Sequence, residues 1–208
     1  MADAKEDLRK IFKSARDAIS YRFVRDHCAQ IQRRILDSSS YSQSRTVALY
    51  AAAGGEVSTD LIFTEAIASG RCVLFPRLDR ATNELVLCRV SGPQDLAPGA
   101  FGILEPQFEE IMDVSTLGRS TMIVPGVAFS SRCERIGRGG GHYDRLLSKV
   151  GAQTVTIGLA YSFQVLDRVP QSLWDRRLDY VATESRFHRA AREVRWSRET
   201  RIEGGVPR

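Results

Sequence analysis

The amino-acid sequence predicts a single α/β domain of three layers, in which helices cover both faces of a mostly parallel, Rossmann-like sheet. Short apolar runs typical of buried strands alternate with segments that have helical periodicity. One such run leads through a loop into a helix, which is the start of a βαβ unit. A chain of 208 residues is also long enough to bury the core of one such domain.

Two amphipathic helices are predicted before the first strand. Apolar residues recur at helical spacing over residues 4–19 and again over residues 21–36. Ser20 stands just before the second helix and is a candidate N-cap. The side chains expected to face the core are Leu8, Ile11, Phe12, Ala15 and Ile19 in the first helix, and Val24, Cys28, Ile31 and Ile35 in the second.

The next segments predict strands, one further helix and a long loop. Residues 46–53 suit a buried strand, and the cluster Ser58-Thr59-Asp60 begins a helix that Gly70 ends. Residues 71–78 predict a short strand stopped by Pro76, and residues 84–90 an edge strand. Residues 91–107 are turn-rich and are interpreted as a functional loop or lid. Further strands are expected at 121–129, at 153–161 and, as the last strand, at 178–182.

Charge and composition restrict the classes of function. The net charge is +5, but seven arginines and three glutamates lie between Ser185 and Arg208. We therefore divide the chain into a domain over 1–184 and an Arg-rich tail over 185–208, helical or partly disordered, and expect no broad nucleic-acid-binding face. No apolar run reaches the length of a membrane span. Four cysteines without Cys-x-x-Cys spacing favour a reduced, cytoplasmic setting, and we expect a monomer.

A glycine-rich loop is the most informative local feature. Residues 135–147 read RIGRGGGHYDRLL, and such a loop running into a helix exposes backbone N–H groups to an anion. Arg135 and Arg138 add positive charge at its rim. A P-loop is excluded, because His142 and Tyr143 stand where Lys and Ser or Thr would follow the last glycine. The loop is interpreted as a phosphate-binding loop, with a flexible surface loop as the alternative.

Other charged residues have a functional and a structural interpretation. Asp144 lies on the first turn after the loop, where it would hold a divalent cation or merely favour the helix N-terminus. Glu56 follows a strand, where open α/β sheets bind ligands, or it is a solvated loop carboxylate. Lys5 and Arg9 project together from one helix face, which would by default be solvated.

Residues 123–147, with IVPGVAF followed by RIGRGGGHYDRLL, resemble the signature of the 5-formyltetrahydrofolate cyclo-ligases, also called methenyltetrahydrofolate synthetases. Lys5-x-x-Leu8-Arg9 is similar to that family's nucleotide-binding helix, and Glu56-Val57-Ser58-Thr59 to its folate-contacting segment. The resemblance implies ATP- and Mg²⁺-dependent cyclisation of 5-formyltetrahydrofolate to 5,10-methenyltetrahydrofolate through an N5-iminium phosphate, with release of ADP and phosphate. The implied partners are a reduced folate and ATP, with neither a membrane nor nucleic acid.

The resemblance also implies a set of site residues. ATP would be bound by Lys5, Arg9, Arg135, Ile136, Gly137, Arg138, Gly139, Gly140, Gly141, His142 and Tyr143. The folate would be bound by Ala51, Glu56, Phe101, Arg138 and Tyr143. Magnesium would be held by Asp144 and Asp179, although on sequence alone an aspartate at the start of a strand, such as Asp179, is more often a turn former.

The sequence departs from the family pattern at three places. Ser130 stands where the family usually has Asp, Cys133 and Glu134 stand where Gly is common, and His142-Tyr143 replaces the usual Tyr-Tyr pair. We expect the loss of a carboxylate at Ser130 to weaken metal binding near the phosphates. Two alternative functions therefore stay open: a catalytically weakened relative that binds folate and nucleotide, and a polyanion-binding module that acts through the Arg-rich tail.

Overall fold

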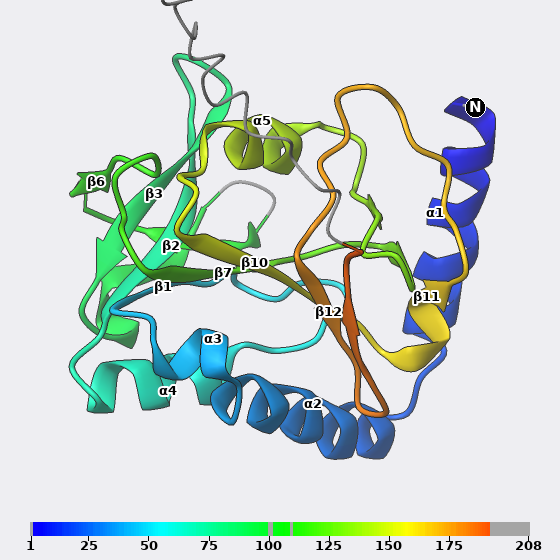
Figure 1. Ribbon diagram of the computed structural model, residues 1–208, viewed down its shortest axis with the longest axis horizontal. Helices are drawn as coiled ribbons and strands as arrows, with labels where there is room; N and C mark the ends of the chain where they lie inside the picture. Colours follow the sequence, from blue (N-terminus) through cyan, green and yellow to red (C-terminus); the bar gives the residue numbers. More distant parts are fainter. Residues whose placement is uncertain (1, 100–101, 109, 192–208) are drawn as a thin grey trace, which may run out of the picture.

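The computed structural model describes residues 2–99, 102–108 and 110–191. Within these residues an eight-stranded sheet forms the centre, with strand order β13-β12-β10-β7-β1-β2-β3-β6 (Figure 1). The strands from β12 to β2 in this order run parallel, whereas β13, β3 and β6 are antiparallel to their neighbours. The strands are β1 (Thr46–Ala48), β2 (Cys72–Asp79), β3 (Glu84–Val90), β6 (Ile111–Met112), β7 (Ser120–Val124), β10 (Thr154–Leu159), β12 (Tyr180–Ala182) and β13 (Phe187–Arg189).

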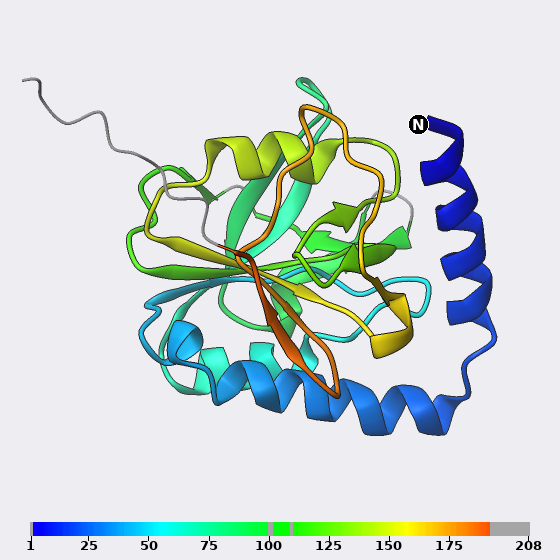
Figure 2. The same ribbon diagram turned by 45° about the vertical axis from the view of Figure 1, so that its right-hand side comes forward.

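Helices cover both faces of this sheet. Helices α2 (Tyr21–Leu36) and α4 (Asp60–Ala68), together with the short α3 (Ser39–Ser42), lie on one face, and α5 (His142–Lys149) lies on the other (Figure 1). Each face buries its own apolar cluster against these helices. The prediction of a three-layer α/β domain with a mostly parallel sheet is therefore confirmed. Helix α1 (Ala2–Asp17) stands beside the layers (Figure 2).

Short elements fill the space between α1 and the sheet. Strand β8 pairs with β9 and β11, and β4 pairs antiparallel with β5. Leu8 and Phe12 of α1 pack in a cluster with Val127, Ala128 and Ile136, which fixes α1 against β8 and β9. These elements are η1 (Pro93–Asp95), β4 (Leu96–Pro98), β5 (Leu104–Pro106), β8 (Ala128–Ser130), β9 (Arg135–Ile136), η3 (Ser162–Gln164) and β11 (Val165–Leu166).

The order of the strands creates a crevice beside β1. From β1 the chain passes through α4 on one face to β2, and later through β7 and α5 on the opposite face to β10. Because the connections leave β1 and β7 toward opposite faces, the segments after their carboxyl ends diverge. In open α/β sheets, ligands bind at such a switch point.

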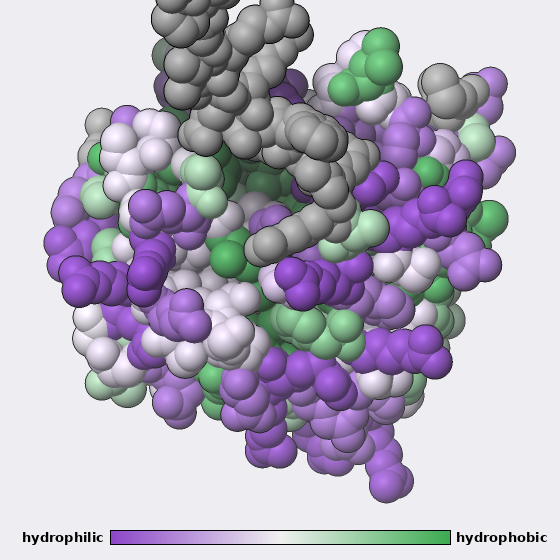
Figure 3. All heavy atoms as spheres, in the orientation of Figure 1, coloured by the Kyte–Doolittle hydropathy of each residue, from purple (hydrophilic) through white to green (hydrophobic). Residues whose placement is uncertain are grey.

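The helices follow the predicted periodicity closely, with one error. Helix α2 has the predicted bounds, Ser20 accepts a hydrogen bond from Phe23 N at 3.2 Å, and Gly70 ends α4 with φ +70°. Figure 3 shows hydrophilic side chains gathered over α2, as an amphipathic helix requires. The expectation that Ile11 is buried is wrong, since 59% of it is exposed. Because α1 packs its apolar side chains against the small cluster at β8 and β9 and not against the sheet, its buried stripe is narrower than that of a helix lying on a sheet.

Pro76 does not stop its strand. Strand β2 continues through it to Asp79, and Pro76 lies opposite Leu87 of β3. Leu74 O accepts a hydrogen bond from Leu49 N on the β1 side, so two residues later the proline nitrogen faces the same side. Strand β1 has already ended there, and the missing N–H therefore removes no hydrogen bond between strands.

Three further expectations are corrected by additional strands. Strand β3 is not at the edge of the sheet, because β6 pairs with its outer side. The loop predicted over 91–107 contains the β4–β5 pair, and the segment predicted as a tail begins with β13, which pairs with β12. Residues 187–189 are therefore extended rather than helical, and the arginines from 192 onward lie outside the described residues. No helix in the described part of the chain is long and apolar enough to cross a membrane.

Candidate active site

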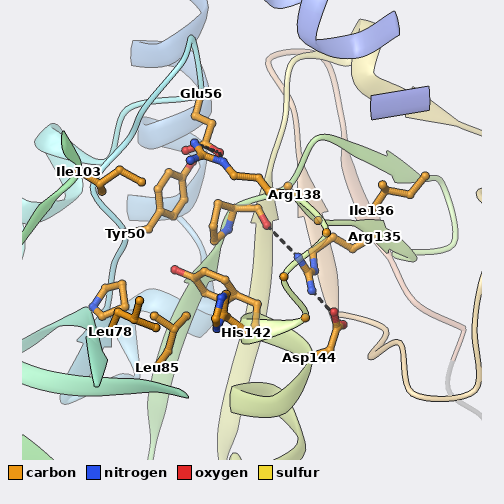
Figure 4. A pocket seen from close by; sticks show the side chains of 18 of the residues that line it. Tyr50, Glu56, Leu78, Leu85, Ile103, Arg135, Ile136, Arg138, His142 and Asp144 are labelled. Atoms are coloured by element: carbon orange, nitrogen blue, oxygen red, sulfur yellow. Dashed lines mark hydrogen bonds and ion pairs between the residues drawn. The ribbon is translucent and has the colours of Figure 1, made fainter. Parts of the chain in front are cut away.

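A pocket of about 720 Å³ lies at the carboxyl ends of β1 and β7. Tyr50 and Ala51 reach it from the end of β1, and Pro125 and Gly126 from the end of β7. Helix α1, the β4–β5 pair, the glycine-rich loop and the segment 172–175 complete its walls. Figure 4 shows a charged side, with Arg135 and Asp144, opposite a side formed by Tyr50, Leu78, Leu85 and Ile103, while Arg138 reaches across from the loop to Glu56.

The glycine-rich loop forms one wall of this pocket along its whole length. All residues from Arg135 to Asp144 line the cavity, so the loop is not packed shut. Gly139 has φ +110° and Gly141, the N-cap of α5, has φ +66°. Any residue other than glycine would be strained in either backbone conformation. The loop therefore leads into the N-terminus of α5 along a path that leaves its backbone accessible from the cavity.

The basic pair of α1 lies beside this loop. Arg9 Nε donates a hydrogen bond to Gly137 O at 2.9 Å. Lys5 Nζ donates to Ser172 Oγ at 2.9 Å and forms an ion pair with Asp175, and its side chain is only 12% exposed. Residues 128 to 170 positions apart in sequence thus meet at the pocket. The alternative of a solvated helix face is wrong for Lys5, while Arg9 also pairs with Glu6 toward solvent.

Asp144 is held in place by the loop and by a distant segment. Its Oδ1 accepts hydrogen bonds from Arg135 Nη2 at 2.9 Å and from Arg176 N at 3.1 Å (Figure 4). The Arg135 side chain is 3% exposed and also donates to Pro125 O at 3.4 Å. Asp144 therefore does more than place a charge at the start of α5, because it ties the glycine-rich loop to the residue after Asp175.

Glu56 contacts the same loop through Arg138. Its Oε1 accepts from Arg138 Nε at 3.2 Å and lies 2.9 Å from Arg138 Nη2 (Figure 4). Its Oε2 accepts from Ala53 N at 3.2 Å, and Arg16 Nη1 lies 3.8 Å from Oε1. With 8% of the residue exposed, Glu56 is not a solvated loop carboxylate.

Two tyrosines border Glu56. Tyr50 donates its hydroxyl proton to Val57 O at 2.6 Å and is 2% exposed. Burial raises the pKa of Tyr50 and of Tyr143 well above that of a free tyrosine, and the nearby negative charge of Glu56 raises both pKa values further. Both phenols are therefore neutral hydrogen-bond donors at physiological pH.

Most of the site residues expected from the sequence meet in this pocket. Phe101 lies outside the described residues. Asp179 is not brought to the pocket, since it precedes β12 and its Oδ2 accepts hydrogen bonds from Thr156 N at 2.8 Å and Thr156 Oγ1 at 2.9 Å. The expected residues that line it are Lys5, Arg9, Ala51, Glu56, Arg135, Ile136, Gly137, Arg138, Gly139, Gly140, Gly141, His142, Tyr143 and Asp144.

Sequence reasoning missed three polar residues at this site. Asp175 and Ser172 line the pocket beside Lys5, and Arg16 lies behind Glu56. Residues 175 and 179 both carry aspartate, and the sequence alone does not decide which one faces the cavity. The carboxylate nearest to the Lys5 ammonium is that of Asp175, through a contact between residues 170 positions apart.

The departures at residues 130–134 form a turn away from the pocket. Ser130 is fully buried, donates to Glu134 Oε2 at 2.8 Å and accepts from Glu134 N and Arg132 N. Glu134 also lies 3.3 Å from Arg177, and Cys133 occupies the left-handed region with φ +65°. The expectation that Ser130 leaves a gap in the metal site is not supported, because Ser130 does not line the pocket.

Comparison with known proteins agrees with this geometry. The model of the 5-formyltetrahydrofolate cyclo-ligase family matches residues 1–184. The chain belongs to this family. Its match spans the glycine-rich loop, the α1 basic pair and Glu56, which are the segments that the structure brings to one pocket.

Relatives and solved structures of cyclo-ligases resemble most of the chain. The probable 5-formyltetrahydrofolate cyclo-ligase of Caenorhabditis elegans is 27% identical over 194 residues, which is 88% of this chain and 93% of that protein. The 5-formyltetrahydrofolate cyclo-ligase of Escherichia coli K12 is 29% identical over 160 residues, which is 76% of this chain and 87% of that protein. The NMR structure of Aquifex aeolicus 5,10-methenyltetrahydrofolate synthetase is 33% identical, with a TM-score of 0.80, and covers 94% of this chain and 98% of that one.

Proposed function

We propose that the protein uses ATP and Mg²⁺ to convert 5-formyltetrahydrofolate to 5,10-methenyltetrahydrofolate, releasing ADP and phosphate. Membership of the cyclo-ligase family supports the reaction. The observation that carries it is that one loop joins two different subsites. Gly137 contacts Arg9 at the basic end, and the next residue, Arg138, contacts Glu56 at the apolar end. A triphosphate on this loop would therefore place its terminal phosphate beside a flat ligand held near Glu56.

The reaction needs little acid or base strength from the protein. The formamide oxygen on N5 is a poor leaving group, so it first attacks the γ-phosphorus of ATP and ADP departs. The N10 amine then bonds to the activated formyl carbon, the N10 proton is lost, and the C–O bond to phosphate breaks. What such a sequence requires is alignment of the γ-phosphate with the formyl oxygen and neutralisation of phosphate charge.

The charged side of the pocket supplies both requirements. We assign the backbone N–H groups of residues 139–141 and the side chains of Lys5, Arg9 and Arg138 to the phosphates, because all of them line the cavity. Arg135 is buried and bonded to Asp144, so its role is to hold the loop and a carboxylate in position. Lys5 and Arg9 are held by contacts with the rest of the domain before a ligand arrives.

The residues present fit a magnesium ion shared with phosphate. Asp144 and Asp175 line the pocket, and a hydrogen bond at the neighbouring Arg176 N links the two segments. Among the described residues no hydrogen bond engages Asp144 Oδ2 or Asp175 Oδ1, so each keeps a free oxygen. No group of three or more metal-binding side chains is found in the described ranges, and one or two carboxylates plus phosphates are the usual setting for Mg²⁺.

Magnesium bound there would neutralise charge on the transferring phosphate. We place it between Asp144 and Asp175 rather than Asp179, whose bonded oxygen faces Thr156.

The other side of the pocket suits a flat, partly polar ring system. Leu78, Leu85 and Ile103 provide apolar contacts and Glu56 provides a polar one (Figure 4), while the neutral phenol of Tyr143 also lines the pocket. We assign Glu56, Ala51 and Tyr143 to the folate. A cytoplasmic location is also proposed, since all four cysteines are free thiols.

The assay that tests this function mixes the purified protein with 5-formyltetrahydrofolate, ATP and Mg²⁺ and follows the absorbance of the methenyl product. We expect product only when all three are present, with one ADP released for each product molecule. Product formation without ATP, or no product at high protein concentration, would contradict the proposal. Binding of tripolyphosphate that collapses with rising salt and resists competition by ATP would favour a simple polyanion-binding protein.

A further inference from the structure

Arg16 is a buried cation, and two of its three guanidinium nitrogens have no hydrogen-bond partner among the described residues. Its side chain is 5% exposed, and within the described residues Nε and Nη1 have no hydrogen-bond partner. Buried polar groups normally have partners, because an unpaired one forfeits its hydration. The nearest carboxylate oxygen is Oε1 of Glu56, 3.8 Å from Nη1. This distance is within reach of an ion pair but longer than a hydrogen bond.

Glu56 thus lies between two arginines, of which Arg138 is exposed and Arg16 is buried. Arg138 is 47% exposed and is carried by a loop with glycines on both sides, and it also donates to Ala53 O at 3.1 Å. Arg16 is carried by helix α1, which is anchored by Phe12 in a buried cluster. One counter-ion of Glu56 can therefore move into the pocket, and the other is fixed behind the carboxylate.

We propose that Arg16 is a positioning residue, the resident counter-ion that holds Glu56 toward the pocket when Arg138 turns from Glu56 to an incoming phosphate. This inference rests on the proposed function, in which Glu56 contacts the folate and Arg138 the nucleotide. The exchange is feasible because Glu56 and Arg16 need to approach by less than about 1 Å to form a hydrogen bond of normal length. That hydrogen bond would also satisfy one of the unused Arg16 donors.

Without Arg16 the exchange becomes unfavourable. A carboxylate that is 5% exposed and keeps only the Ala53 N–H is costly once Arg138 leaves, so Arg138 would stay on Glu56 and the folate would lose its polar contact. The competing explanation is that Arg16 only docks α1 onto the domain. Since α1 also lines the pocket through Lys5 and Arg9, a docking defect would act whether or not Arg138 leaves Glu56.

The test measures two dissociation constants for 5-formyltetrahydrofolate by calorimetry, one without nucleotide and one with a saturating non-hydrolysable ATP analogue and Mg²⁺. We expect Arg16→Met to weaken folate binding at least about ten-fold in the presence of the analogue, and by less than about two-fold in its absence, when Arg138 still neutralises Glu56. Arg16→Lys, which keeps the charge, should recover most of the folate affinity. In a Glu56→Gln background, Arg16→Met should change folate affinity by less than about two-fold, because Arg16 acts through that carboxylate.

Two further variants separate positioning from folding. Arg34→Met is the matched control, since Arg34 also has an unpartnered Nε but bonds Glu184 O at 3.0 Å, away from the pocket. It should leave both constants unchanged. Arg16→Gln keeps hydrogen-bond donors without charge, replaces Arg16→Met if the latter does not fold, and should show the same loss of folate affinity.

Three results would overturn the inference while leaving the proposed function standing: folate affinity in the presence of the analogue unchanged in Arg16→Met, an equal loss in the Glu56→Gln background, or an equal loss with and without the analogue. An original protein that binds ATP but no folate would overturn the proposed function, and this inference with it.

Discussion

Replacing Arg138 by methionine should separate the catalytic use of this arginine from its contribution to stability. In the free protein its guanidinium makes two contacts with Glu56 and one with Ala53 O, at 2.9 to 3.2 Å. Because the side chain is 47% exposed, these contacts are weakened by solvent, and we expect a loss of no more than about 1 kcal/mol in the free energy of unfolding.

In the complex with both substrates the same guanidinium would face phosphate inside the pocket. A charge-assisted hydrogen bond lost there costs about 1.5–3 kcal/mol, which is a decrease of roughly 10- to 150-fold in kcat/KM. Urea denaturation and initial rates of methenyl formation measure the two effects. Arg145→Met is the matched control, since Arg145 lies one turn into α5, bonds His142 and Asn83, and does not line the pocket. A variant of Arg138 that loses stability but retains turnover when folded would refute the assignment.

Three further predictions concern the metal, the loop and a buried thiol. Asp175→Asn should raise the Mg²⁺ concentration needed for half-maximal activity about ten-fold or more, whereas Asp179→Asn should lower the melting temperature without changing that requirement. Gly139→Ala forces a β-carbon into a backbone with φ +110°, costing about 1–3 kcal/mol, and calorimetry should show weaker ATP binding. Burial raises the pKa of the Cys133 thiol to about 12, so iodoacetamide at pH 8 should label the partly exposed Cys72 first. Since the thiol of the unfolded chain ionises near its ordinary pKa of 9.0, this group stabilises the fold below pH 9 and loses that contribution between pH 9 and 12.

The sequence predicts those features of the structure that depend on contacts between residues close together in the chain. The bounds of α2, the Ser20 cap and the end of α4 at Gly70 depend on residues a few positions apart, and all are confirmed. The glycine-rich loop was interpretable for the same reason. Strand continuation through Pro76 was not, because it depends on where the neighbouring strand β1 ends.

The site was predicted in its parts but not in its pairings. The Asp144 and Glu56 carboxylates were identified from their positions after a loop and a strand. Their partners came from elsewhere in the chain: the Glu56 oxygen that Arg16 approaches is separated from it by the whole of α2 and β1, and Asp175 meets Lys5 across 170 positions. Periodicity and motif spacing carry no information about such contacts, which the packing of the whole domain determines.

The position of α1 beside the layers has a consequence for how the enzyme matures. This helix precedes the central sheet in the chain, yet the partners of Lys5 and Arg9 are Asp175 and Gly137, which are synthesised 170 and 128 residues later. The contacts of α1 with the glycine-rich loop and with the segment 172–175 can form only after those segments are made, so the wall of the pocket that α1 supplies is completed late. A protease that cut the chain between α1 and α2 would remove Lys5 and Arg9 from the pocket, and we expect the remaining chain to bind ATP more weakly.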